Sequence, residues 1–402
     1  MWPILALFLL QAPDHNAQGM KALDAGNYAA AAGEFQAAVT ADPKDYGAHF
    51  NLALAFSFLH RDEDGIAEYR KTLDLKPHLY EAELNAGILL LRRKDAGAAE
   101  PLEADAAQQK PNEFRPRYYL AEAQSAQEKW SDAEANYRLA LEIDPQSANA
   151  ELGLGRALAH EHKLDEAAPH YRKAAALDPK NRDWLVELAD LYEKDGKAQA
   201  ALAIYLEFPD NAAVQAHLGE LMLNGKQYAD AIPRLEAAFG REPTEANRVA
   251  LAMAYLFNKQ YDKAVPLIGA AVEAQPSDFE IRMMYARALR DSRQYPAAQA
   301  QFAEAVKLKP NDAPAWRDLA DMLYLTGDYP RALDAFEKAR SLGEDTAGNC
   351  FLRAIILDKL HQLKPALATY ERFLEMSQGK NPDQEFQARH RIVAIQNELK
   401  GH

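Results

Sequence analysis

The sequence has little of what catalytic and disulfide-stabilised proteins depend on. Its 402 residues include one cysteine, Cys350, so an intramolecular disulfide is excluded, as are cysteine-based zinc or iron–sulfur sites. It has no GxxxxGK[ST], GxSxG or HExxH motif, and no GxGxxG after a strand. The nearest imitation, His160-Glu161-His162, puts its two histidines on different faces of a helix end. The sequence therefore predicts a protein that is not an enzyme and has no cofactor-binding or metal-binding site.

Positive charge and long apolar runs are also scarce. The 46 basic residues are outnumbered by 60 acidic ones, a net charge of −14, which disfavours nucleic acid as a partner. The apolar run Trp2–Leu10 is too short to span a bilayer but fits the core of a signal peptide. No basic residue precedes it. For signal-peptide cleavage after Ala12, a small residue would be expected in place of Leu10, and Pro13 would directly follow the cleavage site. We expect residues 1–12 to be a hydrophobic leader and the protein to be exported, periplasmic or secreted; a cytoplasmic protein with an extended first helix is the alternative.

A repeat of about 34 residues fills the rest of the chain. Prolines recur at intervals of 33 or 34 residues, at Pro43, Pro77, Pro111, Pro145, Pro179 and again at Pro243, Pro276 and Pro310. If each of them is position 32, eleven repeats begin near residues 12, 46, 80, 114, 148, 182, 212, 245, 279, 313 and 347. Such a period indicates a stacked array rather than a compact globule.

Three other positions confirm this register. Positions 8 and 20 hold only glycine or alanine in all eleven repeats, for example Gly155 and Ala167 in repeat five. Position 24 is large and apolar, as in Tyr171, except for Glu103 in repeat three. Helical spacing of the apolar residues around a polar turn predicts two antiparallel helices per repeat, with the small residues letting the backbones approach. The proline at position 32 ends the second helix.

Two segments depart from the pattern. Repeat six, 182–211, has 30 residues, and Phe208-Pro209 ends its second helix about one turn early. After residue 380 the period stops, and 381–400 reads as a final helix in a capping segment, 381–402, that closes the array 13–380. We expect this helix to direct four apolar side chains inward: Phe386, Ile392, Val393 and Ile395.

These features resemble the tetratricopeptide repeat family over about residues 13–380. Residues 313–346 carry the pattern best, with Trp316, Leu319, Ala320, Leu323, Tyr329, Ala332, Phe336 and Ala339. The resemblance implies an all-α fold, a right-handed superhelical α-solenoid of about eleven helix–turn–helix repeats with a C-terminal capping helix. It also implies binding of partner proteins or peptide segments along the inner groove.

In such a fold the inner groove is lined by positions 2, 5, 6, 9, 12 and 13 of each first helix. Repeats two to four place there Phe50, Asn51, Leu54, Phe58, Leu84, Asn85, Ile88, Leu91, Arg92, Arg115, Tyr118, Tyr119 and Glu122. Repeats eight and nine add Val249, Met253, Phe257, Met283, Met284, Arg287 and Arg290. Aromatic residues and arginine are typical anchors of interfaces, so we expect partner binding here. Packing between adjacent first helices explains single members, notably Leu54, Leu84 and Val249, equally well.

Two known modes of binding in the family are not met. A clamp for a C-terminal carboxylate would need a lysine near Asn16 and an arginine where Tyr119 stands. A ladder of asparagines that holds an extended peptide backbone begins with Asn51 and Asn85, but the next three repeats have Tyr119, Gly153 and Glu187 at that position. The sequence therefore favours a non-catalytic scaffold that binds a protein or peptide. A chaperone-like assembly factor or adaptor for envelope or secreted proteins is the alternative.

Overall fold

The computed structural model describes residues 14–400, which form α-helices joined by short turns, with no strand in that range. The chain divides into two compact units, residues 1–204 and 205–402. The N-terminal unit contains α1 (His15–Asp24), α2 (Tyr28–Ala41), α3 (Tyr46–Phe58), α4 (Asp62–Leu75), α5 (Tyr80–Arg92), α6 (Ala96–Gln109), α7 (Phe114–Ala126), α8 (Trp130–Ile143), α9 (Ala148–His160), α10 (Leu164–Leu177), the 3-10 turn η1 (Pro179–Asn181), α11 (Trp184–Lys194) and most of α12 (Ala198–Tyr205). The predicted leader, 1–12, lies outside the described residues.

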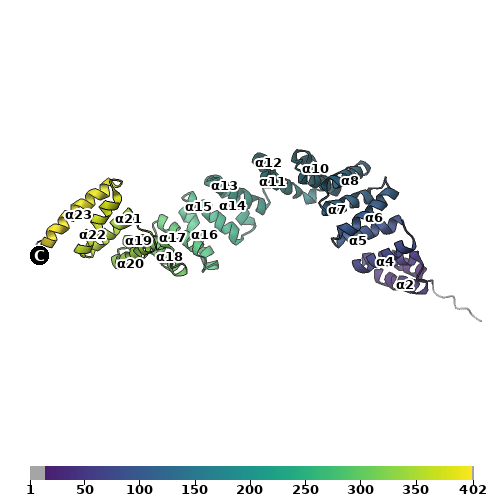
Figure 1. Cartoon of the computed structure of the whole chain (residues 1–402), viewed down its shortest axis with the longest axis horizontal. Coiled ribbons are helices and arrows are strands. Elements are labelled where there is room, and N and C mark those ends of the chain that lie inside the picture. Colours follow the sequence, from purple (N-terminus) through teal and green to yellow (C-terminus); the bar gives the residue numbers. More distant parts are fainter. Residues whose placement is uncertain (1–13, 401–402) are drawn as a thin grey trace, which may run out of the picture. The chain divides into compact units, whose positions relative to one another are not determined.

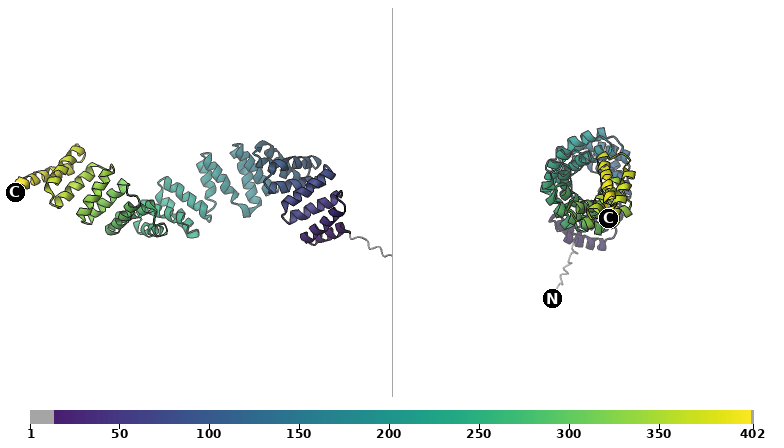
Figure 2. Two further views of the ribbon diagram at one scale, coloured as in Figure 1. Left: turned by 60° about the horizontal axis from the view of Figure 1, so that its bottom comes forward. Right: turned by 90° about the vertical axis from the view of Figure 1, so that its left-hand side faces the viewer.

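The C-terminal unit continues the same pattern of helices. It contains α13 (Ala212–Asn224), α14 (Tyr228–Arg241), α15 (Glu245–Phe257), α16 (Tyr261–Ala274), α17 (Phe279–Asp291), α18 (Tyr295–Leu308), α19 (Ala313–Leu325), α20 (Tyr329–Ser341), α21 (Ala347–Lys359), α22 (Leu363–Ser377) and α23 (Pro382–Lys400). Within each unit, consecutive helices run antiparallel and stack in chain order (Figures 1 and 2). Residues 14–400 thus form eleven successive pairs of helices and one final helix, which confirms the predicted α-solenoid. Between residues 14 and 400 we find no helix with the length and apolar character needed to cross a bilayer.

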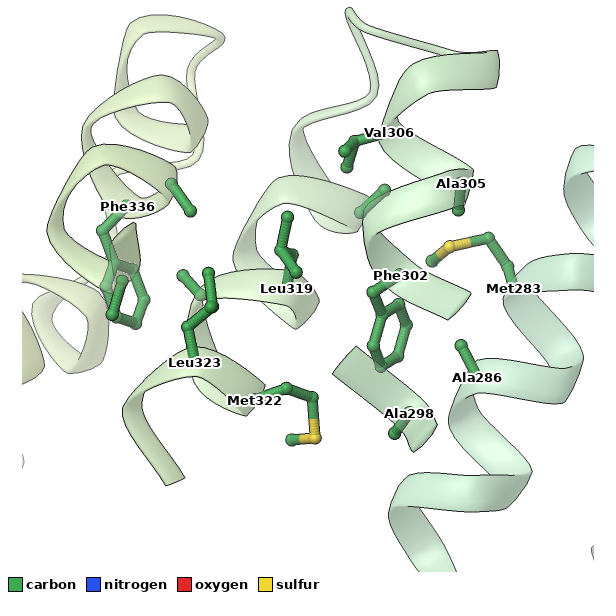
Figure 3. Close-up of a cluster of buried hydrophobic side chains, with 14 of the residues drawn as sticks. Met283, Ala286, Ala298, Phe302, Ala305, Val306, Leu319, Met322, Leu323 and Phe336 are labelled. Carbon is green, nitrogen blue, oxygen red and sulfur yellow. The ribbon is translucent and has the colours of Figure 1, made fainter. Parts of the chain in front are cut away.

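The core is built from the three columns that the sequence predicts. Each residue at positions 8, 20 and 24 is buried in every repeat. Figure 3 shows Phe302 and Phe336, both at position 24, pointing into the layer between neighbouring helices, with Ala286 and Ala298 beside Phe302. Because each hairpin buries its column against the next one, stability comes from contacts between neighbours.

Glu103 is the exception in this core. Its side chain is fully buried, and neither carboxylate oxygen has a hydrogen-bond partner among residues 14–400. Burial raises the pKa of Glu103 to about 9, so that the carboxyl keeps its proton at neutral pH. Gly87, at position 8 of the same repeat, makes room for it, since a Cβ there would lie 2.2 Å from Oε1 of Glu103.

A polar pair joins the two helices of most hairpins, and the sequence analysis did not identify it. The residues stand 19 apart, at positions 4 and 23, and their chemistry changes from repeat to repeat. His49 Nδ1 lies 2.6 Å from Glu68 Oε2, and His170 Nδ1 lies 2.6 Å from Glu151 Oε2. Further pairs are His15–Glu34, Arg117–Asn136, Arg234–Gln215 and Arg282–Gln301, and in repeat eleven the Cys350 thiol donates to the backbone carbonyl of Thr369. Each supplies a buried or half-buried polar group with a partner.

Both predicted departures from the period are present. In repeat six, α12 has 8 residues, whereas most second helices have 14, so the early stop is confirmed. The capping helix α23 is confirmed as well, with Ile395 fully buried. The expectation for two of its side chains is wrong: Phe386 and Val393 are 64% and 57% exposed. They lie seven residues apart on the face of α23 opposite to the one that packs on α22.

Candidate partner-binding site

The predicted groove residues lie in both units, those of repeats two to four in the N-terminal unit and those of repeats eight and nine in the C-terminal unit. Most of them are half-buried, namely Phe50, Asn51, Leu54, Asn85, Ile88, Leu91, Tyr118, Tyr119, Glu122, Val249, Met253, Met284 and Arg290. Phe58, Arg92, Arg115, Phe257 and Arg287 are exposed. These exposures are compatible with a binding surface.

Two members of the predicted set belong to the core instead. Leu84 is 3% exposed and Met283 is 2% exposed. Figure 3 shows the Met283 side chain directed toward Phe302 and Ala305 rather than away from the helices. Both residues occupy position 5, which turns toward the neighbouring helices in these repeats. The prediction that they line a partner-binding surface is therefore wrong.

Two exposed aromatic residues are already engaged within the chain. The ring of Phe58 stacks on Tyr28 with centroids 4.6 Å apart, and the ring of Phe257 stacks on Tyr228 at 5.1 Å. Trp130 and His160 repeat this contact at 3.9 Å, with planes 2° apart. In every case position 13 of one repeat meets position 17 of the repeat before it. These stacks hold adjacent hairpins together, so Phe58 and Phe257 have a structural role independent of any partner.

Three of the four arginines of the predicted set, Arg92, Arg287 and Arg290, also contact neighbouring repeats. Arg92 Nε donates to Asp62 Oδ2 at 2.8 Å. Arg287 Nε donates to Asp318 Oδ2 at 3.2 Å, and Arg290 Nη1 lies 3.8 Å from Asp318 Oδ1. Since Asp318 is almost fully buried, these arginines neutralise a buried carboxylate. Their exposed surfaces are available for contact, but their charges are partly balanced.

The N-terminal unit contains a pocket of about 550 Å³ at the predicted inner positions. We call it the Tyr118 pocket. It is lined by Tyr118, Glu122, Ser125 and Ala126 of α7, Trp130 and Tyr137 of α8, Asn149, Leu152, Gly153, Arg156 and His160 of α9, and Trp184 of α11. Its volume lies within the range of ligand pockets, and its lining combines aromatic faces with a few polar groups.

Gly153 allows Tyr137 to form one side of this pocket. A Cβ at Gly153 would lie 2.4 Å from Cζ of the Tyr137 ring, so a larger residue would displace the ring. The Tyr137 hydroxyl donates to Glu122 Oε1 at 2.5 Å. Burial raises the pKa of Tyr137, and the Glu122 carboxylate adds to the shift. The tyrosine therefore stays protonated and fixes the position of Glu122.

A second polar group borders the pocket beside Trp184. Arg156 donates to both carboxylate oxygens of Glu187, at 2.9 Å from Nε and 2.6 Å from Nη2. The Tyr171 hydroxyl donates to the same carboxylate at 2.7 Å. A bidentate pair with a third donor has a fixed geometry. The guanidinium thus presents a rigid, partly neutralised surface to the pocket.

Several lining residues were missed by the sequence analysis. Asn149, Arg156 and His160 occupy positions 2, 9 and 13 of repeat five, the same register that identified Tyr118 and Glu122 in repeat four. Extending the register by one repeat would have found them. Trp130 and Tyr137 belong to a second helix, and their role depends on contact with the next hairpin, for which the repeat pattern gave no signal.

Stacked antiparallel hairpins of this length define a helical-repeat protein. Sequence profiles of the tetratricopeptide repeat match residues 16–57, 118–181 and 285–347, and a second profile of the same repeat matches 158–207 and 225–288. Together they cover more than half of the chain. The chain belongs to the tetratricopeptide repeat family.

Individual proteins resemble only parts of the chain. The Hsp70-Hsp90 organizing protein of Triticum aestivum is 32% identical over 88 residues, 22% of this chain and 15% of that protein. DnaJ homolog subfamily C member 3 of Bos taurus is 34% identical over 86 residues, 21% of this chain and 17% of that protein. The matches thus span about a sixth of these relatives. Among solved structures, MamA from Desulfovibrio magneticus RS-1 overlaps 41% of this chain and 94% of its own, with 20% identity and a TM-score of 0.40.

Proposed function

We propose that the protein is a non-catalytic scaffold that binds segments of a partner protein at the Tyr118 pocket and along the adjoining inner positions of the N-terminal unit. The observation that carries this proposal is the pocket itself, in which aromatic rings from four helices surround a few fixed polar groups. Tetratricopeptide repeats bind protein partners, and aromatic residues and arginine dominate the energetics of such contacts.

The charges of the pocket favour a basic anchor on the partner. Glu122 and Arg156 line the pocket, and the charge of Arg156 is balanced by Glu187 beside it, so Glu122 leaves one negative charge. The faces of Tyr118 and Trp184 attract cations through their ring quadrupoles. We therefore expect the bound segment to insert a lysine or arginine side chain with apolar neighbours.

The chaperone-like alternative is less well supported. It relied on a flexible stripe of methionine and phenylalanine side chains, which would adapt to many clients. Met283 is buried, and Phe58 and Phe257 are stacked on tyrosines of the chain itself. Much of the surface that remains is held by ring stacks and ion pairs within the chain, which suits a defined partner better than a range of unfolded segments.

Affinity purification from the native host, followed by calorimetry with the purified partner, tests the proposal. Tyr118→Ala and Trp184→Ala should each weaken binding by about tenfold or more. Tyr46→Ala is the control, because Tyr46 is an exposed aromatic residue outside the pocket. Glu122→Gln should weaken the binding of a basic segment and reduce the salt dependence of that binding. Equal affinity of all four variants would refute the assignment of the pocket, and capture of many unfolded proteins at no fixed ratio would favour the chaperone alternative.

We further propose that the protein is exported. The proposal rests on the apolar run Trp2–Leu10.

A further inference from the structure

A histidine and two carboxylates meet where the loop after repeat two contacts repeat three, and none of them lines the Tyr118 pocket. His78 precedes α5, Glu83 lies on α5 and Asp105 lies on α6. One ligand atom from each residue lies within 4.8 Å of the other two. His78 Nδ1 is 2.5 Å from Asp105 Oδ2 and 3.8 Å from Glu83 Oε1.

Comparison with other repeats shows that this cluster lacks the lysine found there. Glu83 is at position 4, which corresponds to Glu151 in repeat five. There the carboxylate is paired with His170 at position 23 and with Lys173 at position 26, whose Nζ is 2.5 Å from Oε1. The lysine also recurs at position 26 of repeat two, where Lys71 contacts Glu68 at 2.7 Å.

Repeat three replaces both partners. Leu102 stands at position 23 and Asp105 at position 26, so a second carboxylate occupies the place of the lysine. Neither Glu83 nor Asp105 forms an ion pair with lysine or arginine among residues 14–400; His78 is their basic neighbour. Glu83 is 4% exposed. Gln109 Nε2 donates to its Oε2 at 2.5 Å, which leaves Oε1 directed toward His78 and Asp105.

The backbone keeps His78 beside the carboxylates. Its φ of +57° lies in the left-handed region, whereas most other non-glycine residues of this kind lie in the turn inside a hairpin. The His78 side chain is 74% exposed, so an ion from solvent can reach the cluster and the imidazole can adjust its position. The buried carboxylate is fixed on one side and an adjustable ligand faces it from the other.

We propose that His78, Glu83 and Asp105 bind a divalent transition-metal ion of the zinc class. One imidazole and two carboxylates are the ligands that Zn²⁺, Co²⁺ and Mn²⁺ accept, and metal–ligand bonds of about 2.1 Å require ligand atoms roughly 3–4 Å apart. The separation of 3.8 Å between His78 Nδ1 and Glu83 Oε1 already lies in that range, and a small rotation of the imidazole would lengthen its 2.5 Å contact with Asp105 Oδ2 into it. The ion supplies the positive charge that lysine provides in repeats two and five, and it ties the loop before α5 to both helices of the hairpin.

Metal titration of the full chain without a histidine tag tests the site. Binding of Co²⁺, followed by its visible absorption, and of Zn²⁺, followed by calorimetry, should show one site that His78→Ala and Asp105→Asn each weaken by about tenfold or more. His170→Ala is the matched control, because it removes the corresponding histidine of repeat five, where Lys173 already balances the carboxylate. This control should bind the ion as the unaltered chain does.

Asp105→Lys gives a second, independent readout. It recreates the arrangement of repeat five, so it should abolish metal binding while raising the melting temperature of the metal-free protein. The unaltered chain should instead melt at a higher temperature only when the ion is added. Absence of binding at about 100 µM metal, or binding that His78→Ala and Asp105→Asn leave unchanged, overturns the proposal. Circular dichroism of each variant checks that the helices are intact.

Discussion

Replacing Glu103 by leucine should make the protein more stable, although the residue lies in the core. Repeat seven shows that the change fits, because it combines Gly219 at position 8 with Leu235 at position 24, as repeat three combines Gly87 with Glu103. Leucine fills the same space without a polar group. Glu103 buries two unpaired oxygens instead.

The size of the effect follows from the pKa. In the folded chain Glu103 keeps its proton up to about pH 9, whereas its ordinary pKa is 4.5, so unfolding releases a proton between these values. The free energy of unfolding therefore falls as the pH rises, by about 1.4 kcal/mol per pH unit. The part of the penalty that comes from this titration is absent below pH 4.5 and reaches about 3 kcal/mol at pH 7. Glu103→Leu should recover roughly this amount at pH 7 and remove the slope.

Urea unfolding followed by circular dichroism at pH 5, 6.5 and 8 measures both quantities. Hydrogen exchange in α5, α6 and α7 reports the local free energy even where the two units unfold separately. Glu103→Gln should flatten the slope while keeping a buried polar group, which separates titration from packing. Ile268→Leu, a conservative change at position 24 of repeat eight, should leave the slope unchanged. If Glu103→Leu is less stable than the unaltered chain at pH 8, the carboxylate has a stabilising partner and the reasoning fails.

Three further outcomes can be measured directly. Gly153→Ala should cost about 1–3 kcal/mol in urea unfolding and weaken partner binding, because the methyl group displaces Tyr137; unchanged binding would show that this ring does not shape the pocket. Phe386→Ser should change stability by less than about 0.5 kcal/mol, whereas Ile395→Ala should cost about 2–5 kcal/mol, and the reverse order would restore the inward orientation of Phe386. Intact-mass spectrometry of protein from the native host should show that residues 1 to about 12 have been removed; a full-length mass would contradict export through a cleaved leader.

The fold could be predicted from the sequence because its interior repeats with the chain. Positions 8, 20 and 24 meet the same neighbours in every hairpin. The same pattern of small and large residues, such as Ala298 and Phe302, therefore recurs in all eleven repeats and identifies the fold. The final helix has no such repetition. Its apolar residues fit two faces equally well, and without a following hairpin nothing in the pattern distinguishes Phe386 from Ile395.

The candidate sites depend on contacts between repeats, which the period alone does not describe. Positions of the inner face were predicted as a class, but whether a member is exposed varies with its neighbours, as the burial of Leu84 shows. The cluster around His78 joins a loop and two helices through residues separated by 5 and 22 positions, a spacing that matches no known metal motif. Only the packed hairpin brings these side chains together.

The polar pairs inside the hairpins bear on how a chain of similar segments reaches one arrangement. In repeat two the acid, Glu68, is on the second helix, while in repeat five the acid, Glu151, is on the first. Exchange of second helices between these two hairpins would set carboxylate against carboxylate and leave the two imidazoles facing each other. Similar hairpins are prone to such misassembly during folding. The changing pairs thus disfavour some wrong combinations of helices, such as this exchange between repeats two and five.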